Sequence, residues 1–294
     1  YIYADFYHAI MDGTAIVLLF WRELDKRYRG KVITRKSASY ADYVWNEAKL
    51  LKSGNEEGHQ YWKKMLEGFD VKKHLPPVDI HGNESWAEGC VEYDIKNINN
   101  DFFHNSLYSE NSFIMAGVIA AMSKVTGEKT AIMSWVHNAR MTVSELRLMG
   151  LMINQLPIRW EFSDDMTAKA FVTALEEKIK EGLSYHKGLD VVYKNDLEGE
   201  CASFLLQKNT DITASYILDG KPIAIQEMPA NKISAAENVL DIKMIAMEDG
   251  SYHLTLDYDA SRYSEQSMMN FAHVVDDMLL ALQDEDASLM EVLQ

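Results

Sequence analysis

The sequence predicts an α/β (α+β) two-layer fold, and three observations support this class. The 294 residues are enough for about two domains, and their 47% apolar and 25% charged content is that of an ordinary globular protein. Stretches with strand-like and helix-like periodicity alternate along the second half of the chain. Asp249 and Gly250 lie between two strand-like stretches, which is typical of a β-hairpin. Strands mixed with helices in this way indicate packed sheet and helix layers.

The individual elements follow in chain order. Helices are predicted over residues 12–28, 39–51, 56–66, 112–125, 167–183 and 264–282. Strands are predicted over residues 2–6, 91–95, 131–136, 150–159, 202–206, 214–218, 239–247 and 252–258. The first helix is apolar all round in its first half, which predicts that its N-terminal part is buried. Pro76 and Pro77 favour extended backbone in front of them, so residues 74–89 are the best candidate for a crossing linker.

Charge and cysteine content exclude several classes of function. The net charge is 29 minus 45, or −16, which repels phosphate backbones and anionic lipids and argues against nucleic-acid and membrane partners. No apolar run approaches the roughly 20 residues of a membrane span. The two cysteines, Cys90 and Cys201, exclude a disulfide-dense scaffold and a multi-cysteine metal site. Their scarcity suits a reducing compartment, so a cytoplasmic location is expected.

The segment 7–13 stands out as a candidate site, because it lies between a predicted strand and a predicted buried helix. Loops held by rigid elements are where catalytic groups concentrate. His8 is the only one of nine histidines followed by an acid and a glycine at such a junction. Two structural alternatives stay open: Asp12 could cap the helix through its carboxylate, and His8 could be a hydrogen-bonded core histidine. A metal site is disfavoured because no third ligand lies nearby in sequence.

This segment, with Tyr7, His8, Asp12 and Gly13, resembles the His-His-x-x-x-Asp-Gly motif of the condensation domains of nonribosomal peptide synthetases. That motif belongs to a superfamily that includes chloramphenicol acetyltransferase. Further segments resemble the family in order and spacing: 39–43, 61–62, 66–68, 75–77, 127–140, 149–159, 240–242 and 256–259. The resemblance covers essentially the whole chain. Tyr7 replaces the first motif histidine, and the Asp-x-x-x-x-Asp variant of heterocyclising members is absent from this segment.

The resemblance implies two chloramphenicol acetyltransferase-like subdomains arranged in a V, with the active site at their junction. Residues 1–30 would end the N-terminal subdomain and carry the motif, 31–90 would form a helical and crossing linker region, and 91–294 would form the C-terminal subdomain. The chain opens in a strand-like pattern without an initiator methionine or signal peptide. We therefore expect most of the N-terminal subdomain to lie upstream of the first residue given.

The resemblance also implies roles for individual residues. His8 is the catalytic candidate, as a general base or as a group that positions the amine. Asp12 and Gly13 complete the catalytic motif. Asp12 is interpreted as structural and paired with a buried arginine, for which Arg140 is preferred to Arg159. Tyr7 would support the loop by packing, and Asn154 would line the substrate channel, although an outward-facing strand position is an open alternative. No metal is expected.

The implied activity is amide bond formation by attack of a carrier-bound aminoacyl amine on an upstream carrier-bound acyl or peptidyl thioester. The implied partners are upstream and downstream peptidyl carrier proteins and an adjacent adenylation domain. No cofactor would be bound directly, since the substrates travel on the phosphopantetheine arms of the carriers. Two alternatives stay open: an epimerisation domain of the same fold, and a non-catalytic recruitment domain, which Tyr7 favours.

Overall fold

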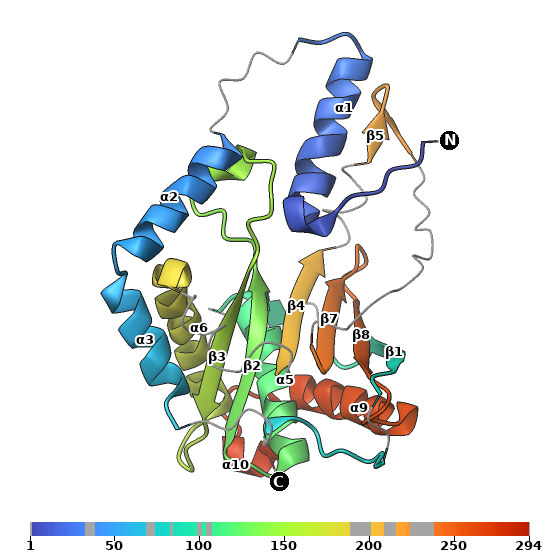
Figure 1. Ribbon diagram of the computed structural model, residues 1–294. Helices are drawn as coiled ribbons and strands as arrows, with labels where there is room; N and C mark the ends of the chain where they lie inside the picture. The colour runs from blue at the N-terminus through green and yellow to red at the C-terminus, as the bar shows by residue number, and fades with distance from the viewer. Residues whose placement is uncertain are drawn as a thin grey trace. The chain divides into compact units, whose positions relative to one another are not determined.

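The computed structural model describes residues 2–32, 39–68, 74–82, 85–98, 102–103, 108–188, 201–208, 216–223 and 238–293 (Figure 1). The chain forms two compact units. Unit 1 comprises Tyr1–Asn55, His137–Asn154 and Lys208–Ile233, and unit 2 comprises Glu56–Val136, Gln155–Gln207 and Ser234–Gln294. Both units are assembled from segments that are distant in sequence. The predicted subdomain boundaries at residues 30 and 90 stay a prediction.

A six-stranded sheet forms the framework of unit 2, which confirms the mixed α/β class. In spatial order its strands are β1 (Glu88–Ile95), β8 (Tyr252–Asp259), β7 (Leu240–Ala246), β4 (Ala202–Lys208), β2 (Thr130–His137) and β3 (Asn154–Glu161). β1 and β7 both pair antiparallel with β8, whereas β2 and β4 are parallel. The predicted hairpin is present, since β7 and β8 pair from Leu240 opposite Tyr258 to Ala246 opposite Tyr252.

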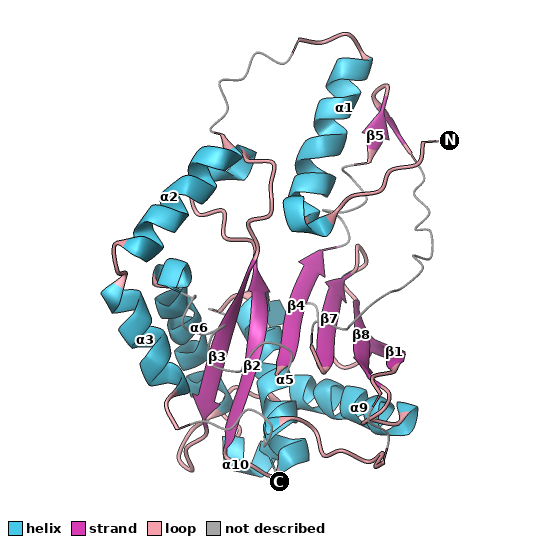
Figure 2. Cartoon of the chain, in the orientation of Figure 1, coloured by secondary structure: helices cyan, strands magenta, loops and turns pink. Residues whose placement is uncertain are grey.

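Helices cover one face of this sheet (Figure 2). They are α5 (Glu110–Thr126), α6 (Ala168–Ser184) and α9 (Glu265–Ala281), and α10 (Leu289–Leu293) closes the chain. α5 is buried from Ser112 to Ser123, because it packs against the sheet and against both α6 and α9. Gly127 ends α5 in the left-handed conformation, with φ of 70°.

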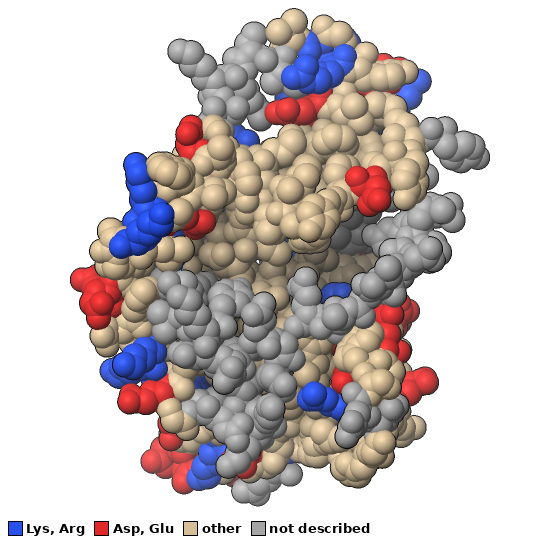
Figure 3. Space-filling view, viewed as in Figure 1, with Lys and Arg blue, Asp and Glu red and all other residues tan. Residues whose placement is uncertain are grey.

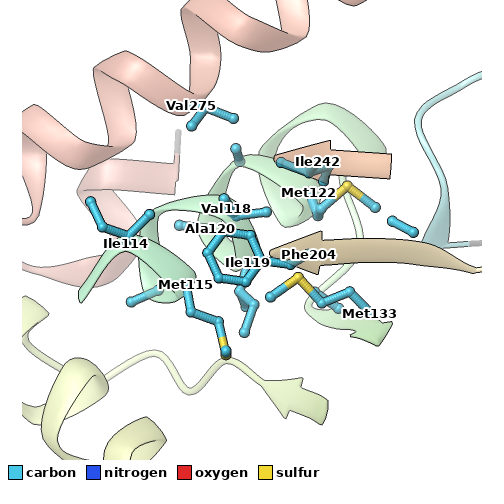
Figure 4. Packing of buried hydrophobic residues seen from close by; sticks show 14 of the residues in the cluster. Ile114, Met115, Val118, Ile119, Ala120, Met122, Met133, Phe204, Ile242 and Val275 are labelled. Carbon is cyan, nitrogen blue, oxygen red and sulfur yellow. The ribbon is translucent and has the colours of Figure 1, made fainter. Parts of the chain in front are cut away.

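The core of unit 2 lies between α5 and the strands (Figure 4). Apolar side chains on one side of α5 meet side chains of β2, β4 and β7, while Val275 of α9 lies on another side of the helix. The α5 members that Figure 4 labels are Ile114, Met115, Val118, Ile119, Ala120 and Met122. A helix enclosed in this way must be apolar nearly all round, as this one is.

The helix α3 (Glu56–Leu66) joins unit 2 through its tryptophan and its C-terminal end. Trp62 is fully buried and donates from Nε1 to the Tyr185 carbonyl at 2.9 Å. Arg159 donates from Nη1 to the carbonyls of Met65 and Glu67 at 3.4 and 3.3 Å. Unpaired carbonyls at a helix C-terminus attract a cation there, so this arginine stabilises the end of α3.

Unit 1 contains the motif segment and two longer helices. Its elements are η1 (His8–Ile10), the π-helix η2 (Ala15–Phe20), α1 (Trp21–Tyr28), α2 (Tyr40–Lys52), η4 (Glu145–Arg147), β5 (Ile217–Leu218) and β6 (Lys221–Pro222). β5 and β6 form a two-residue hairpin that was not predicted. Asp219 and Gly220 both have positive φ, as the turn of such a hairpin requires.

Three predictions about unit 1 are wrong. Residues 2–6 form no strand, because an alternating segment needs a neighbouring strand and none lies beside it among the described residues. Residues 150–153 are loop rather than strand, because their backbone groups bond to a buried ion pair described below. The early helix is less buried than expected: Ala15 is enclosed, whereas residues 16–20 are half-buried.

Of the predicted strand 214–218, positions 214 and 215 lie outside the described residues, and Ile217–Leu218 is β5.

Two further observations concern the classes of function that the sequence excluded. Within the part of the chain that is described, no helix combines the length and apolarity needed to cross a membrane. The face drawn in Figure 3 carries both acidic and basic side chains.

Candidate active site

Asp12 is the centre of the motif segment, and its side chain is fully buried. Oδ1 accepts from the Ala15 backbone N–H at 2.8 Å and from Arg140 Nη2 at 3.0 Å. Oδ2 accepts from Arg140 Nη1 and from the Met152 backbone N–H, both at 2.8 Å. A carboxylate has about four lone-pair positions, so these donors occupy all of them.

Arg140 completes this centre, and its side chain is buried as fully as that of Asp12. Nη1 and Nη2 each donate once to Asp12, and Nη2 also donates to the carbonyls of Leu148 and Gly150, both at 3.2 Å. Its backbone N–H donates to Asn138 Oδ1 at 2.9 Å, which holds the residue at the end of the loop that follows β2. The bidentate pair of hydrogen bonds between Arg140 and Asp12 fixes both the distance and the orientation of the two side chains.

This geometry determines what Asp12 can do chemically. With every lone-pair position occupied, the carboxylate has none left for a substrate proton or for a metal ion. Its bond from Ala15 also caps the helix that starts at Gly13, so the helix-cap interpretation and the arginine pairing hold together. Asp12 is therefore a positioning residue that ties the motif loop to residues 140–152.

His8 and Tyr7 lie on the outer side of the same loop. Both are exposed, Tyr7 to 74%, so the alternative of a buried core histidine is wrong. His8 opens the short helix η1, and the Met11 backbone N–H donates to its carbonyl at 3.3 Å. No hydrogen bond joins the His8 imidazole to another described residue, so both ring nitrogens are available to a ligand.

The other predicted residues are placed differently. Gly13 is exposed at the start of the helix, and no atom lies within 4 Å of where a Cβ would stand. Asn154 is half-buried at the first position of β3. Arg159, the less favoured partner for Asp12, instead makes its contacts with α3. Among the described residues, no cluster of three His, Cys, Asp or Glu side chains is suited to a metal ion.

The sequence did not predict the residues that bond to Asp12 or to the loop segment 150–152 beside it. Tyr40 donates from its hydroxyl to the Leu151 carbonyl at 2.7 Å, and Gly150 and Met152 bond to Asp12 through their backbones. Burial raises the pKa of the Tyr40 hydroxyl, so it stays protonated and a donor at neutral pH. The signal was present, since Tyr40 lies in one family-like segment and Gly150 in another, but neither pattern indicates that the segments touch.

The chain is similar to known proteins over nearly its whole length. A family model described as "Condensation domain" matches residues 1–291. Nonribosomal peptide synthetase fmqA of Aspergillus fumigatus is 23% identical over 257 residues, covering 84% of this chain and 6% of fmqA. Bacitracin synthase 3 of Bacillus licheniformis is 23% identical over 287 residues, covering 90% of this chain and 4% of the synthase. The chain thus spans only a small part of these relatives.

The solved structure described as the condensation domain from Monacolin K polyketide synthase MokA matches with a TM-score of 0.77 at 17% identity, over 96% of this chain and 70% of that one. At 17% identity, this likeness shows the fold alone. The family is shown by the family model, which covers residues 1–291. The chain belongs to the condensation domain family of nonribosomal peptide synthetases.

Proposed function

We propose that this condensation domain forms an amide bond between two carrier-bound substrates in the cytoplasm. The donor is an acyl or peptidyl group in thioester linkage to the phosphopantetheine arm of an upstream peptidyl carrier protein. The acceptor is the α-amine of an aminoacyl group on a downstream carrier, which an adjacent adenylation domain would supply with activated amino acid. The protein itself needs to bind no cofactor for this chemistry.

One observation carries the proposal: the buried Asp12–Arg140 pair holds the motif loop while His8 stays exposed at its surface. A histidine with unoccupied ring nitrogens on an anchored loop can meet an incoming amine in a fixed orientation. Positioning of two tethered reactants can supply up to about 7–11 kcal/mol of the barrier in ideal cases. General base catalysis contributes about 10²–10⁴-fold.

The reaction step balances without any further reagent. The neutral amine attacks the thioester carbonyl, a C–N bond forms, and the C–S bond then breaks. The proton lost by the amine passes to the His8 imidazole and from there to the departing thiolate of the donor arm. Because an α-amine titrates near pH 8, much of it is already neutral, and we assign His8 a large positioning share.

Gly13 and Asn154 have secondary roles in this proposal. The Gly13 N–H lies at a helix start, where backbone donors favour the developing oxyanion. The open space around its Cα suits close approach of a substrate. Asn154 would contribute a polar group to the substrate channel.

Mass spectrometry of the carrier-bound products tests the proposal. A donor carrier that bears N-acetylated aminoacyl groups is mixed in D₂O with acceptor carriers that bear each proteinogenic amino acid, in the presence of the full-length domain that includes the expected N-terminal subdomain. We expect an acceptor carrier whose mass has increased by the donor group. Incorporation of deuterium at the α-carbon, without transfer, would instead identify an epimerisation domain. If neither change occurs with any pair, the recruitment alternative replaces the proposal.

A further inference from the structure

We propose that Tyr40 is a positioning residue for the His8 loop, acting through the backbone of residues 150–152. This inference rests on the function proposed above and deepens it. Tyr40 is the first residue of α2, and Leu151, to which it bonds, lies 111 positions further along the chain. The contact therefore links two segments whose association the chain sequence does not impose.

Tyr40 holds this segment in two ways. Its hydroxyl donates to the Leu151 carbonyl at 2.7 Å. Its ring lies flat against Gly150, so closely that a Cβ on Gly150 would come within 2.3 Å of a ring carbon. Real Cβ atoms do not approach a neighbour this closely, so only glycine fits at position 150 without moving the ring or the loop.

The held segment is the one that supports Asp12. The Gly150 carbonyl accepts from the Asp12 backbone N–H at 3.3 Å and from Arg140 Nη2 at 3.2 Å. Two residues on, the Met152 N–H donates to Asp12 Oδ2 at 2.8 Å. Leu151 lies between these two contacts, so its bond to Tyr40 sets the position of both.

A displacement of Asp12 would reach His8 through the backbone of residues 9–11. Asp12 follows Met11, whose N–H donates to the His8 carbonyl at 3.3 Å. Misplacement of a catalytic group by about 1 Å can cost about 10²-fold in rate. The tyrosine hydroxyl, rather than the ring alone, is what fixes residue 151, since a phenylalanine ring could pack against Gly150 equally well.

The test compares two tyrosines of the same helix. Tyr40→Phe removes the hydroxyl that bonds to Leu151. Tyr43→Phe is the matched control, because the Tyr43 hydroxyl donates to Glu47 of its own helix at 2.8 Å. Steady-state transfer between loaded carriers gives kcat and the KM for the acceptor carrier. We expect Tyr40→Phe to lower kcat by about 10- to 100-fold with KM unchanged, and Tyr43→Phe to retain the wild-type kcat.

Hydrogen exchange of the peptide covering residues 7–14 provides a readout that does not depend on activity. We expect faster exchange there in Tyr40→Phe than in Tyr43→Phe, with the same thermal midpoint in both. Equal kcat values and equal exchange in the two variants would overturn the role of Tyr40. Failure of the proposed function would look different: the wild-type protein would transfer nothing, while the exchange comparison would still decide whether Tyr40 holds the loop.

Discussion

Asp12 and Arg140 form a fully buried ion pair at the centre of the motif segment. Both side chains are completely enclosed, which is costly for two charges unless their hydrogen-bonding positions are filled. Here two backbone N–H groups and the guanidinium fill them on the carboxylate, while the carbonyls of Leu148 and Gly150 both accept from Nη2 of the guanidinium. The pair therefore fixes three pieces of unit 1 relative to one another: the motif loop, the loop after β2, and residues 148–152.

Arg140→Met tests this pair at the level of stability. The variant keeps an unbranched side chain but leaves a buried carboxylate without its cation, so the free energy of unfolding is expected to fall by about 3–5 kcal/mol. Urea denaturation followed by circular dichroism measures the change. Arg159→Met is the control, because that half-buried arginine bonds the carbonyls of Met65 and Glu67 at 3.4 and 3.3 Å and pairs with no buried carboxylate in these bonds, so its loss should cost far less. Equal losses in the two variants would contradict a special role for the pair.

The residue-scale predictions from sequence succeeded where a short pattern carries its own chemistry. The acid and glycine at residues 12–13 indicated a helix start, and Asp12 does cap it. Its contact with Arg140 came from the family resemblance and not from spacing, because the two residues are 128 positions apart. The part played by Tyr40 could not be predicted, since a hydroxyl that bonds a distant carbonyl leaves no periodic signal.

At the scale of elements, the hairpin β5–β6 is attached to helix α1 by one buried carboxylate. Asp25 is 1% exposed and accepts from the Gly220 backbone N–H at 2.8 Å, while Arg29 bonds its other oxygen. Trp21 adds an edge-to-face contact with Tyr216, with ring centroids 5.7 Å apart. A hairpin of this length is too small to be stable alone, so these contacts hold it in place.

This attachment should depend on pH. The bond from Gly220, followed by those from Arg29, holds the pKa of Asp25 below its ordinary value. Folding therefore stabilises the ionised form of Asp25. Its contribution to the stability of the folded state is complete above the unfolded pKa of about 3.9, and it is lost as pH falls through the lower pKa of the folded state.

The Gly220 amide resonance, followed by NMR from pH 7 towards pH 2, measures this titration. We expect its midpoint below the ordinary aspartate value, and no such titration of this amide in Asp25→Asn. A midpoint at or above about 3.9 would contradict the prediction, because the bonds from Gly220 and Arg29 would then not outweigh the opposing effect of burial on the pKa of Asp25.

Strands and helices were predicted well where burial produces a periodic pattern in the sequence. They were predicted less well where hydrogen-bonding partners distant in sequence determine the secondary structure. α6, α9 and the β7–β8 hairpin lie within a few residues of their predicted ranges, because each buries a periodic apolar face. α5 does so because it is an apolar run that ends at Gly127. Residues 2–6 alternate like a strand but pair with no other strand among the described residues. Residues 150–153 are apolar like a strand, yet their backbone groups serve the Asp12–Arg140 pair instead.

At the scale of the whole molecule, the sequence predicted the mixed fold and the family from the order of many short segments. It did not predict that unit 1 gathers residues 1–55, 137–154 and 208–233. That grouping depends on contacts such as Arg140 with Asp12 and Gly220 with Asp25, which join loops and not periodic elements. The family could therefore be predicted from the order of short segments, whereas the loops that support the site could not.

The measurement that tests the central claim most directly is the single-turnover rate of amide formation with His8→Ala. Both carriers are loaded, and the product is followed by mass spectrometry against the wild-type protein and against His81→Ala, which removes an exposed histidine of unit 2. We predict a fall of about 10²-fold or more in His8→Ala, with the rate of His81→Ala unchanged. Amide product formed by His8→Ala at the wild-type rate would contradict the account.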